Sequence, residues 1–163
     1  MRSEGALISR PATTAMDAAL IFTHLLPMHA EVGRAPLDHK KMLANVAHSV
    51  MRHAAYVVED VSGDEPRIIA SMGLIELDYW YSQDSYLSEV WFYVHPDYRD
   101  GEAARLLLAE ARQLSERTGL SVMLVAFSEK RQRPRNGLER IATQVSFAPA
   151  GAIFAVQGDA HVG

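Results

Sequence analysis

The stretch that decides the fold runs from Leu87 to Thr118 and reads LSEVWFYVHPDYRDGEAARLLLAEARQLSERT. It begins as an apolar, aromatic and β-branched run typical of a strand, breaks at His95-Pro96, and continues as an amphipathic helix that ends before Gly119. A helix N-terminus has backbone N–H groups without intrahelical partners and carries roughly half a positive charge. The strand, turn and helix therefore predict an anion site at the turn, and we expect a pyrophosphate there.

Composition limits the class of protein. The 163 residues are 48% hydrophobic and 22% charged, which predicts one domain over 1–163 with a polar tail at 157–163. No apolar run reaches about 18 residues and the first residues do not resemble a secretory signal, so we expect a cytoplasmic protein with no membrane partner. The absence of cysteine excludes disulfides, thiolate zinc sites and a cysteine nucleophile. A net charge of −4 argues against nucleic acid as a partner.

Hydrophobic periodicity and turn residues predict an alternating order of elements and an α/β (α+β) class. Short connections between the second, third and fourth strands favour antiparallel pairing, and the crossover helix places the fifth strand parallel to the fourth. The segment 27–36 is predicted to be a loop because it holds two prolines and a glycine. The expected strands are 6–9, 54–61, 67–80, 87–94, 120–127 and 151–156, and the expected helices are 15–28, 36–53, the helix ending at Thr118, and 137–145.

This order of elements resembles the GNAT superfamily of acyl-CoA-dependent N-acyltransferases over nearly the whole chain. The segment VHPDYR at 94–99 is similar to the V-x-P-x-x-R motif of that family, and Leu106-Leu107 stands where the family has an aliphatic pair. The family continues Arg-x-x-Gly-x-Gly/Ala; Ala104 fits its last position, whereas Glu102 stands at the first and Gly101 lies one residue early. The resemblance implies a mixed, mostly antiparallel sheet of about six to seven strands with a splayed parallel pair, flanked by about four helices.

The resemblance also implies acetyl-CoA as the cofactor. Its pantetheine arm would bond to the strand backbone at Tyr93, Val94 and His95. Its pyrophosphate would lie at the turn, where Arg99 adds a positive charge and small residues allow close approach of the backbone. The basic segment 130–135 either holds the adenosine 3′-phosphate or is a solvated loop. The residues predicted at the pyrophosphate are Arg99, Asp100, Gly101, Glu102, Ala103 and Ala104.

Acyl transfer to an amine needs a general base, and Glu89 is the leading candidate because it begins an otherwise apolar strand. The alternative is a solvated glutamate at a strand end. The family often uses a tyrosine on its last helix as the acid, but here the matching position is Ala142. Either the thiolate leaves unassisted, or Tyr93 or Ser128 supplies the proton, or the chain does not catalyse acyl transfer.

The predicted acceptor site combines His29 and Glu31 with Tyr79 and Tyr81, since acidic and aromatic side chains suit a cationic amine. The alternative for the tyrosines is packing at a hairpin end. No metal is expected, because the histidine spacing does not match that of helical zinc pairs.

The predicted function is N-acetyl transfer from acetyl-CoA to a small-molecule or peptide amine by direct attack in a ternary complex, with homodimerisation left open. The alternatives are a non-catalytic CoA-binding or interaction module, and a structural protein in which the splayed strands would be closed.

Overall fold

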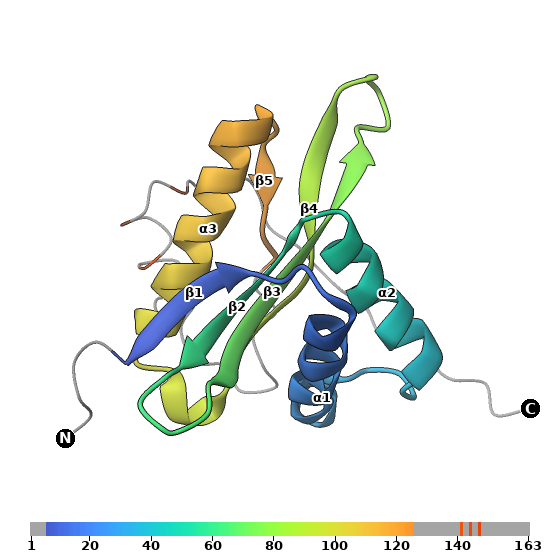
Figure 1. Ribbon diagram of the computed structural model, residues 1–163. Helices are drawn as coiled ribbons and strands as arrows, with labels where there is room; N and C mark the ends of the chain where they lie inside the picture. The colour runs from blue at the N-terminus through green and yellow to red at the C-terminus, as the bar shows by residue number, and fades with distance from the viewer. Residues whose placement is uncertain (1–5, 126–140, 142–143, 145–146, 148–163) are drawn as a thin grey trace, which may run out of the picture.

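A computed structural model describes residues 6–125, 141, 144 and 147. Their strands form one sheet in the order β1-β2-β3-β4-β5, in which β1 to β4 pair antiparallel and β5 pairs parallel with β4 (Figure 1). The mixed sheet with one parallel pair is therefore confirmed. The described part has five strands instead of the predicted six to seven, and the predicted strand 151–156 lies outside it. The strands are β1 (Leu7–Pro11), β2 (Ala55–Asp60), β3 (Arg67–Asp78), β4 (Ser85–Val94) and β5 (Val122–Met123).

Helices cover both faces of this sheet (Figure 1). Helices α1 (Ala15–Val32) and α2 (His39–Met51) pack on one face, and α3 (Glu102–Thr118) packs on the other, after the short 3-10 turn η1 (Pro96–Tyr98). The described residues hold three complete α-helices instead of four, because only residues 141 and 144 of the predicted helix 137–145 are among them. Of the helices in the described part, none is long and apolar enough to cross a membrane.

Helix α1 is longer than predicted. It begins at a capping box, in which the Thr14 hydroxyl accepts from the Asp17 N–H and the Asp17 carboxylate accepts from the Thr14 N–H. It continues through Pro27 to Val32, so the predicted loop 27–36 is half helical. Proline removes one helical N–H donor but does not always end a helix. Consequently both His29 and Glu31 lie on α1.

The sheet separates two hydrophobic cores. Tyr56, Met72 and Leu74 pack with Leu107 under α3, whereas Val57 and Trp91 pack with Ile21, Leu25 and Val46 under α1 and α2. Strand β4 contributes to both cores, because its side chains alternate between the faces. This double burial accounts for its nearly continuous apolar sequence.

A β-bulge interrupts the pairing of β3 with β4. Gly73 pairs with Trp91 but Leu74 pairs with Glu89, so Val90 is the additional residue on β4. The Trp91 ring lies over Gly73, where an added Cβ would come within 1.9 Å of the ring carbon Cζ3. The bulge therefore requires a glycine opposite the tryptophan, and it sets the direction of Glu89 relative to the residues that follow.

Candidate functional site

The parallel strands β4 and β5 separate almost as soon as they meet. Leu87 pairs with Val122 and Ser88 with Met123, and within the described residues no further pair joins the two strands. At the next residue, the Glu89 carboxylate reaches across the opening and accepts a hydrogen bond from the Val125 N–H at 2.9 Å. In a continued parallel ladder, the Val125 N–H would donate to a backbone carbonyl of β4. Here it donates to the Glu89 side chain instead. Over residues 122–125, the two strands therefore differ from the closed pair expected of a purely structural protein.

Burial determines the protonation of Glu89. It raises the pKa of the Glu89 carboxyl to about 7, against the opposing effect of the hydrogen bond from Val125. The glutamate is therefore not the fully solvated strand-end residue of the alternative interpretation. A carboxylate with this pKa can accept and return a proton near neutral pH.

The backbone of β4 presents different residues to the opening than the sequence predicted. The His95 N–H donates to the Ile69 carbonyl of β3 at 2.8 Å, and ladder alternation directs the Tyr93 backbone to β3 as well. The backbone groups that face the β5 side belong to Phe92 and Val94. The predicted pantetheine contacts therefore do not fit the Tyr93 backbone or the His95 N–H. The predicted residue Val94 does face the β5 side, together with Phe92, because strand parity depends on the β3 register.

The turn after β4 is fixed to the β2–β3 connection, which lies at the same end of the sheet. Tyr98 is buried, and its hydroxyl donates to Asp60 at 2.5 Å and accepts from Arg67 at 2.9 Å. Asp60 ends β2 and Arg67 begins β3, so this contact holds the turn against the β2–β3 connection. No sequence pattern predicted this anchor, although a large aromatic residue inside a polar turn is a signal of one.

The N-terminus of α3 retains the features of an anion site. The N-cap residue Gly101 has a φ of 105°, which favours glycine, and it has no side chain with which to cap the helix. The Glu102 N–H donates to the Asp100 carboxylate at 3.2 Å, and the first helical hydrogen bond is that of Arg105 to the Gly101 carbonyl. The N–H groups of Ala103 and Ala104 lie before this first bond and have no acceptor within the helix. As N–H donors at a helix N-terminus, they suit a pyrophosphate.

The side chains of three predicted residues have other surroundings than the anion site: two are in the core and one is exposed. Ala103 and Ala104 are buried in the core beneath α3, so their small side chains allow the helix to approach the sheet. Glu102 is exposed in the first helical turn, where a negative charge is favoured by the helix dipole.

Arg99 is paired with Glu31, although the sequence analysis assigned these two residues to different ligands. The guanidinium donates to both carboxylate oxygens, at 2.6 and 2.8 Å, and its Nε donates to the Val94 carbonyl at 2.9 Å. Its charge also lies 5.6 Å from the centre of the Tyr93 ring. The structure therefore joins the predicted acceptor and cofactor regions through one ion pair.

Tyr93 and His24 form a tilted ring contact beside this pair. Their ring centres are 5.1 Å apart, and among the described residues neither the Tyr93 hydroxyl nor His24 Nε2 has a hydrogen-bond partner. Burial raises the pKa of the Tyr93 phenol and lowers the pKa of the His24 imidazole to about 4. Tyr93 is thus a protonated hydroxyl at neutral pH.

Comparison with solved structures identifies this architecture. A GNAT family acetyltransferase from Staphylococcus aureus has a TM-score of 0.58 and 17% identity, with coverage of 93% of this chain and 98% of that one. The fold is that of the GNAT acetyltransferases. A predicted acetyltransferase with acetyl-CoA from Clostridium acetobutylicum has a TM-score of 0.64 at 14% identity, covering 93% and 96% of the two chains. A ribosomal-protein-alanine N-acetyltransferase from Brucella melitensis has a TM-score of 0.56 at 18% identity, covering 94% and 99%.

The sequence comparisons give no match: no protein-family model fits the chain, and no curated protein is significantly similar to it. The likeness to these structures is therefore one of fold, with the GNAT arrangement of splayed strands, turn and helix.

Within the GNAT fold, the predicted acceptor residues do not form one group. Tyr79 contacts Tyr81 and Tyr86, with ring centres 5.5 and 4.7 Å apart, at the end of β4 that is remote from Arg99 and Glu31. His29 Nε2 lies 2.7 Å from the Ala35 carbonyl and bridges the turn after α1. The tyrosines match the hairpin-packing alternative.

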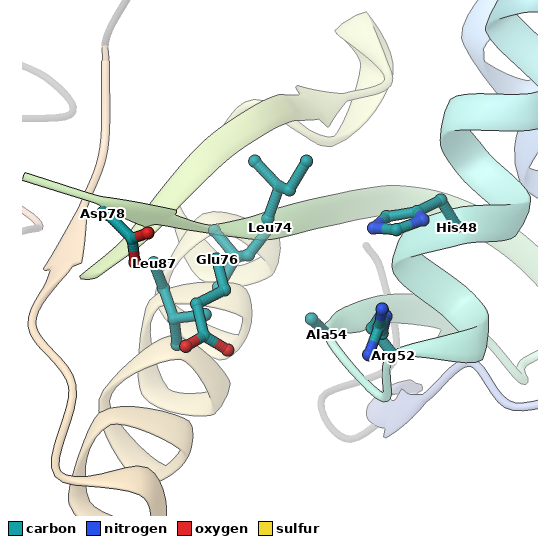
Figure 2. A pocket seen from close by; sticks show the side chains of 8 residues that line it. His48, Arg52, Ala54, Leu74, Glu76, Asp78 and Leu87 are labelled. Atoms are coloured by element: carbon teal, nitrogen blue, oxygen red, sulfur yellow. The ribbon is translucent and has the colours of Figure 1, made fainter. Parts of the chain in front are cut away.

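A pocket of about 410 Å³ opens between the C-terminal end of α2 and the far half of β3 (Figure 2). The sequence analysis did not identify it, because its walls come from three separate segments. It is lined by His48, Arg52, Ala54, Leu74, Ile75, Glu76, Asp78 and Leu87.

Proposed function

We propose that this chain transfers an acetyl group from acetyl-CoA to an amine by direct attack. The observation that carries the proposal is Glu89, whose carboxylate crosses the opening between β4 and β5 and has a pKa of about 7. The GNAT fold supports the same reaction class, and one structure with this fold is described with acetyl-CoA.

The proposed roles follow from the groups around the opening. The backbone of Phe92 and Val94 would contact the pantetheine arm, and the N–H groups at the start of α3 would bind the pyrophosphate. Arg99 would add positive charge once it exchanges part of its contact with Glu31. Acetyl-CoA supplies a thioester whose carbonyl carbon accepts the attacking nitrogen.

The proton and bond changes balance without a further reactant. Glu89 removes a proton from the acceptor ammonium, and the neutral nitrogen attacks the carbonyl carbon. A new C–N bond replaces the C–S bond as the sulfur leaves. The second proton of the nitrogen passes to the Tyr93 phenolate once that phenol has given its own proton to the sulfur, and Glu89 releases the first proton to solvent. Tyr93 is the proposed donor to the sulfur, since burial keeps its phenol protonated; CoA then leaves as the thiol.

Two measurements test the proposal. Calorimetric titration should give saturable acetyl-CoA binding, and a thiol-reactive dye should detect CoA release that requires an added amine. Absence of binding at millimolar acetyl-CoA would contradict the proposal. Binding without amine-dependent release over a broad amine panel would favour the non-catalytic CoA-binding module.

A further inference from the structure

The pocket lies where β3 extends past the start of β2. The pairing of these strands begins at Ala55 and Gly73, and the Leu74 N–H donates to the Ala54 carbonyl at 2.9 Å. Residues 75–78 therefore form a strand edge that β2 does not cover. The last turn of α2 stands beside this edge, held by the Ser49 hydroxyl, which donates to the Leu74 carbonyl at 3.0 Å. The pocket is thus bounded by a rigid strand and a fixed helix end.

The walls of the pocket differ in chemistry. Figure 2 shows the Glu76 and Asp78 carboxylates on the β3 side, and His48 and Arg52 on the α2 side. Buried leucines, Leu74 and Leu87, contribute the apolar surface between these walls. The volume of about 410 Å³ falls in the range of small-molecule sites.

The opposite charges do not neutralise each other directly. Within the described part of the chain, neither the Arg52 guanidinium nor the Glu76 carboxylate forms an ion pair, and Asp78 accepts only a hydrogen bond from the Ser85 hydroxyl at 2.7 Å. A ligand with a cationic and an anionic end could therefore pair with both walls at once.

The pocket also borders the segment that carries the candidate base. Leu74 is paired with Glu89 across β3 and β4, and Leu87 precedes Glu89 by two positions on β4. A ligand amine held near the carboxylates would thus lie beside the strand on which Glu89 stands.

We propose that this pocket is the acceptor site and that it selects amino-carboxylates, in which an apolar body separates an amine from a carboxylate. Glu76 and Asp78 bind the ammonium, Arg52 binds the carboxylate, and Leu74 and Leu87 contact the body. The assignment rests on the proposed acetyl transfer. The reaction is the one described above, with the amine of the amino-carboxylate forming the new C–N bond.

A matched set of acceptors tests the proposal. The probes are 6-aminohexanoate, its uncharged amide 6-aminohexanamide, and hexylamine, together with glycine and 4-aminobutyrate as shorter amino-carboxylates. We expect kcat/KM for 6-aminohexanoate to exceed that for the amide and for hexylamine by at least about tenfold, the effect of one charge-assisted hydrogen bond.

Two variants separate the walls. Arg52→Gln should raise the KM for 6-aminohexanoate about tenfold and leave the KM for hexylamine unchanged, whereas Glu76→Gln should raise the KM for both. Arg112→Gln and Glu65→Gln are the controls, since both residues are exposed and lie outside the pocket. Thermal melting checks that all four variants fold.

Each outcome decides one of the two proposals. The pocket assignment would be overturned, and acetyl transfer left intact, by equal kcat/KM values for the three six-carbon amines. The same would follow if Arg52→Gln raised the KM for hexylamine as much as the KM for 6-aminohexanoate. Calorimetric binding of 6-aminohexanoate that Arg52→Gln abolishes, with no binding of acetyl-CoA, would support the pocket and refute acetyl transfer.

Discussion

At the scale of single residues, the environment of Glu89 determines what its carboxylate can do. As a general base it must be ionised, so kcat/KM should rise with pH and level off above about pH 7, the pKa set by its burial. Glu89→Gln should lower kcat/KM by about a hundredfold or more and remove this inflection, without changing the Kd of acetyl-CoA. A pH–rate profile and calorimetry measure both effects. An unaltered profile in the variant would exclude Glu89 as the base.

The same pKa predicts a dependence of stability on pH. Because the folded-state pKa of Glu89 is raised above the usual value of 4.5, the folded state binds more protons than the unfolded state between pH 4.5 and about 7. The contribution of Glu89 to the free energy of unfolding is therefore present below pH 4.5 and is lost as pH rises to about 7, by up to about 3 kcal/mol. Urea denaturation of wild type and Glu89→Gln at pH 5 and pH 8 should show that the variant gains relative stability at pH 8. A difference of zero, or of the opposite sign, would contradict the burial of this carboxyl.

At the scale of elements, the bulge in β4 depends on the contact between Gly73 and Trp91. Gly73→Ala should reduce the free energy of unfolding by about 1–3 kcal/mol, because the new methyl group must displace a buried indole whose Nε1 donates to Ser71 Oγ at 3.1 Å. Urea denaturation measures the loss, and near-UV circular dichroism reports on the indole. Gly63→Ala is the matched control, since the nearest atom to its added Cβ would be 3.9 Å away. Equal stability of the two variants would show that the ring moves without cost.

At the scale of the whole molecule, the Glu31–Arg99 ion pair connects α1 on one face of the sheet to the turn that leads into α3 on the other. Glu31→Gln should tighten acetyl-CoA binding several-fold, because the carboxylate no longer neutralises the arginine near the expected pyrophosphate. The cost in stability should stay below about 1 kcal/mol, since both side chains are partly exposed.

Calorimetry at low and moderate salt measures the effect of Glu31→Gln on cofactor binding. Glu116→Gln provides the control, because it makes the same change in charge at the exposed Arg112–Glu116 pair on α3. Weaker cofactor binding in Glu31→Gln would indicate that the ion pair positions Arg99 and does not compete for it.

The sequence alone supports much of the fold and part of the site. Local periodicity and turn residues predicted the order of the elements through β5, the parallel partner of β4, and a helix N-terminus after the turn. They also identified Glu89, because a carboxylate stands out in an apolar strand. Helix α1 extends past its predicted end, since Pro27 lies inside the helix and does not end it.

Short-range patterns in the sequence encode element type, chain order, and the strand–turn–helix unit. Only the tertiary structure decided which β4 backbone groups face β5, that Arg99 pairs with Glu31, that burial raises the pKa of Glu89, and that α2 and the far half of β3 form a pocket. Each of these depends on register or on burial between residues distant in the chain. A one-residue bulge reverses the faces of a strand, and a pKa depends on the groups that exclude water, so neither property can be obtained from local sequence.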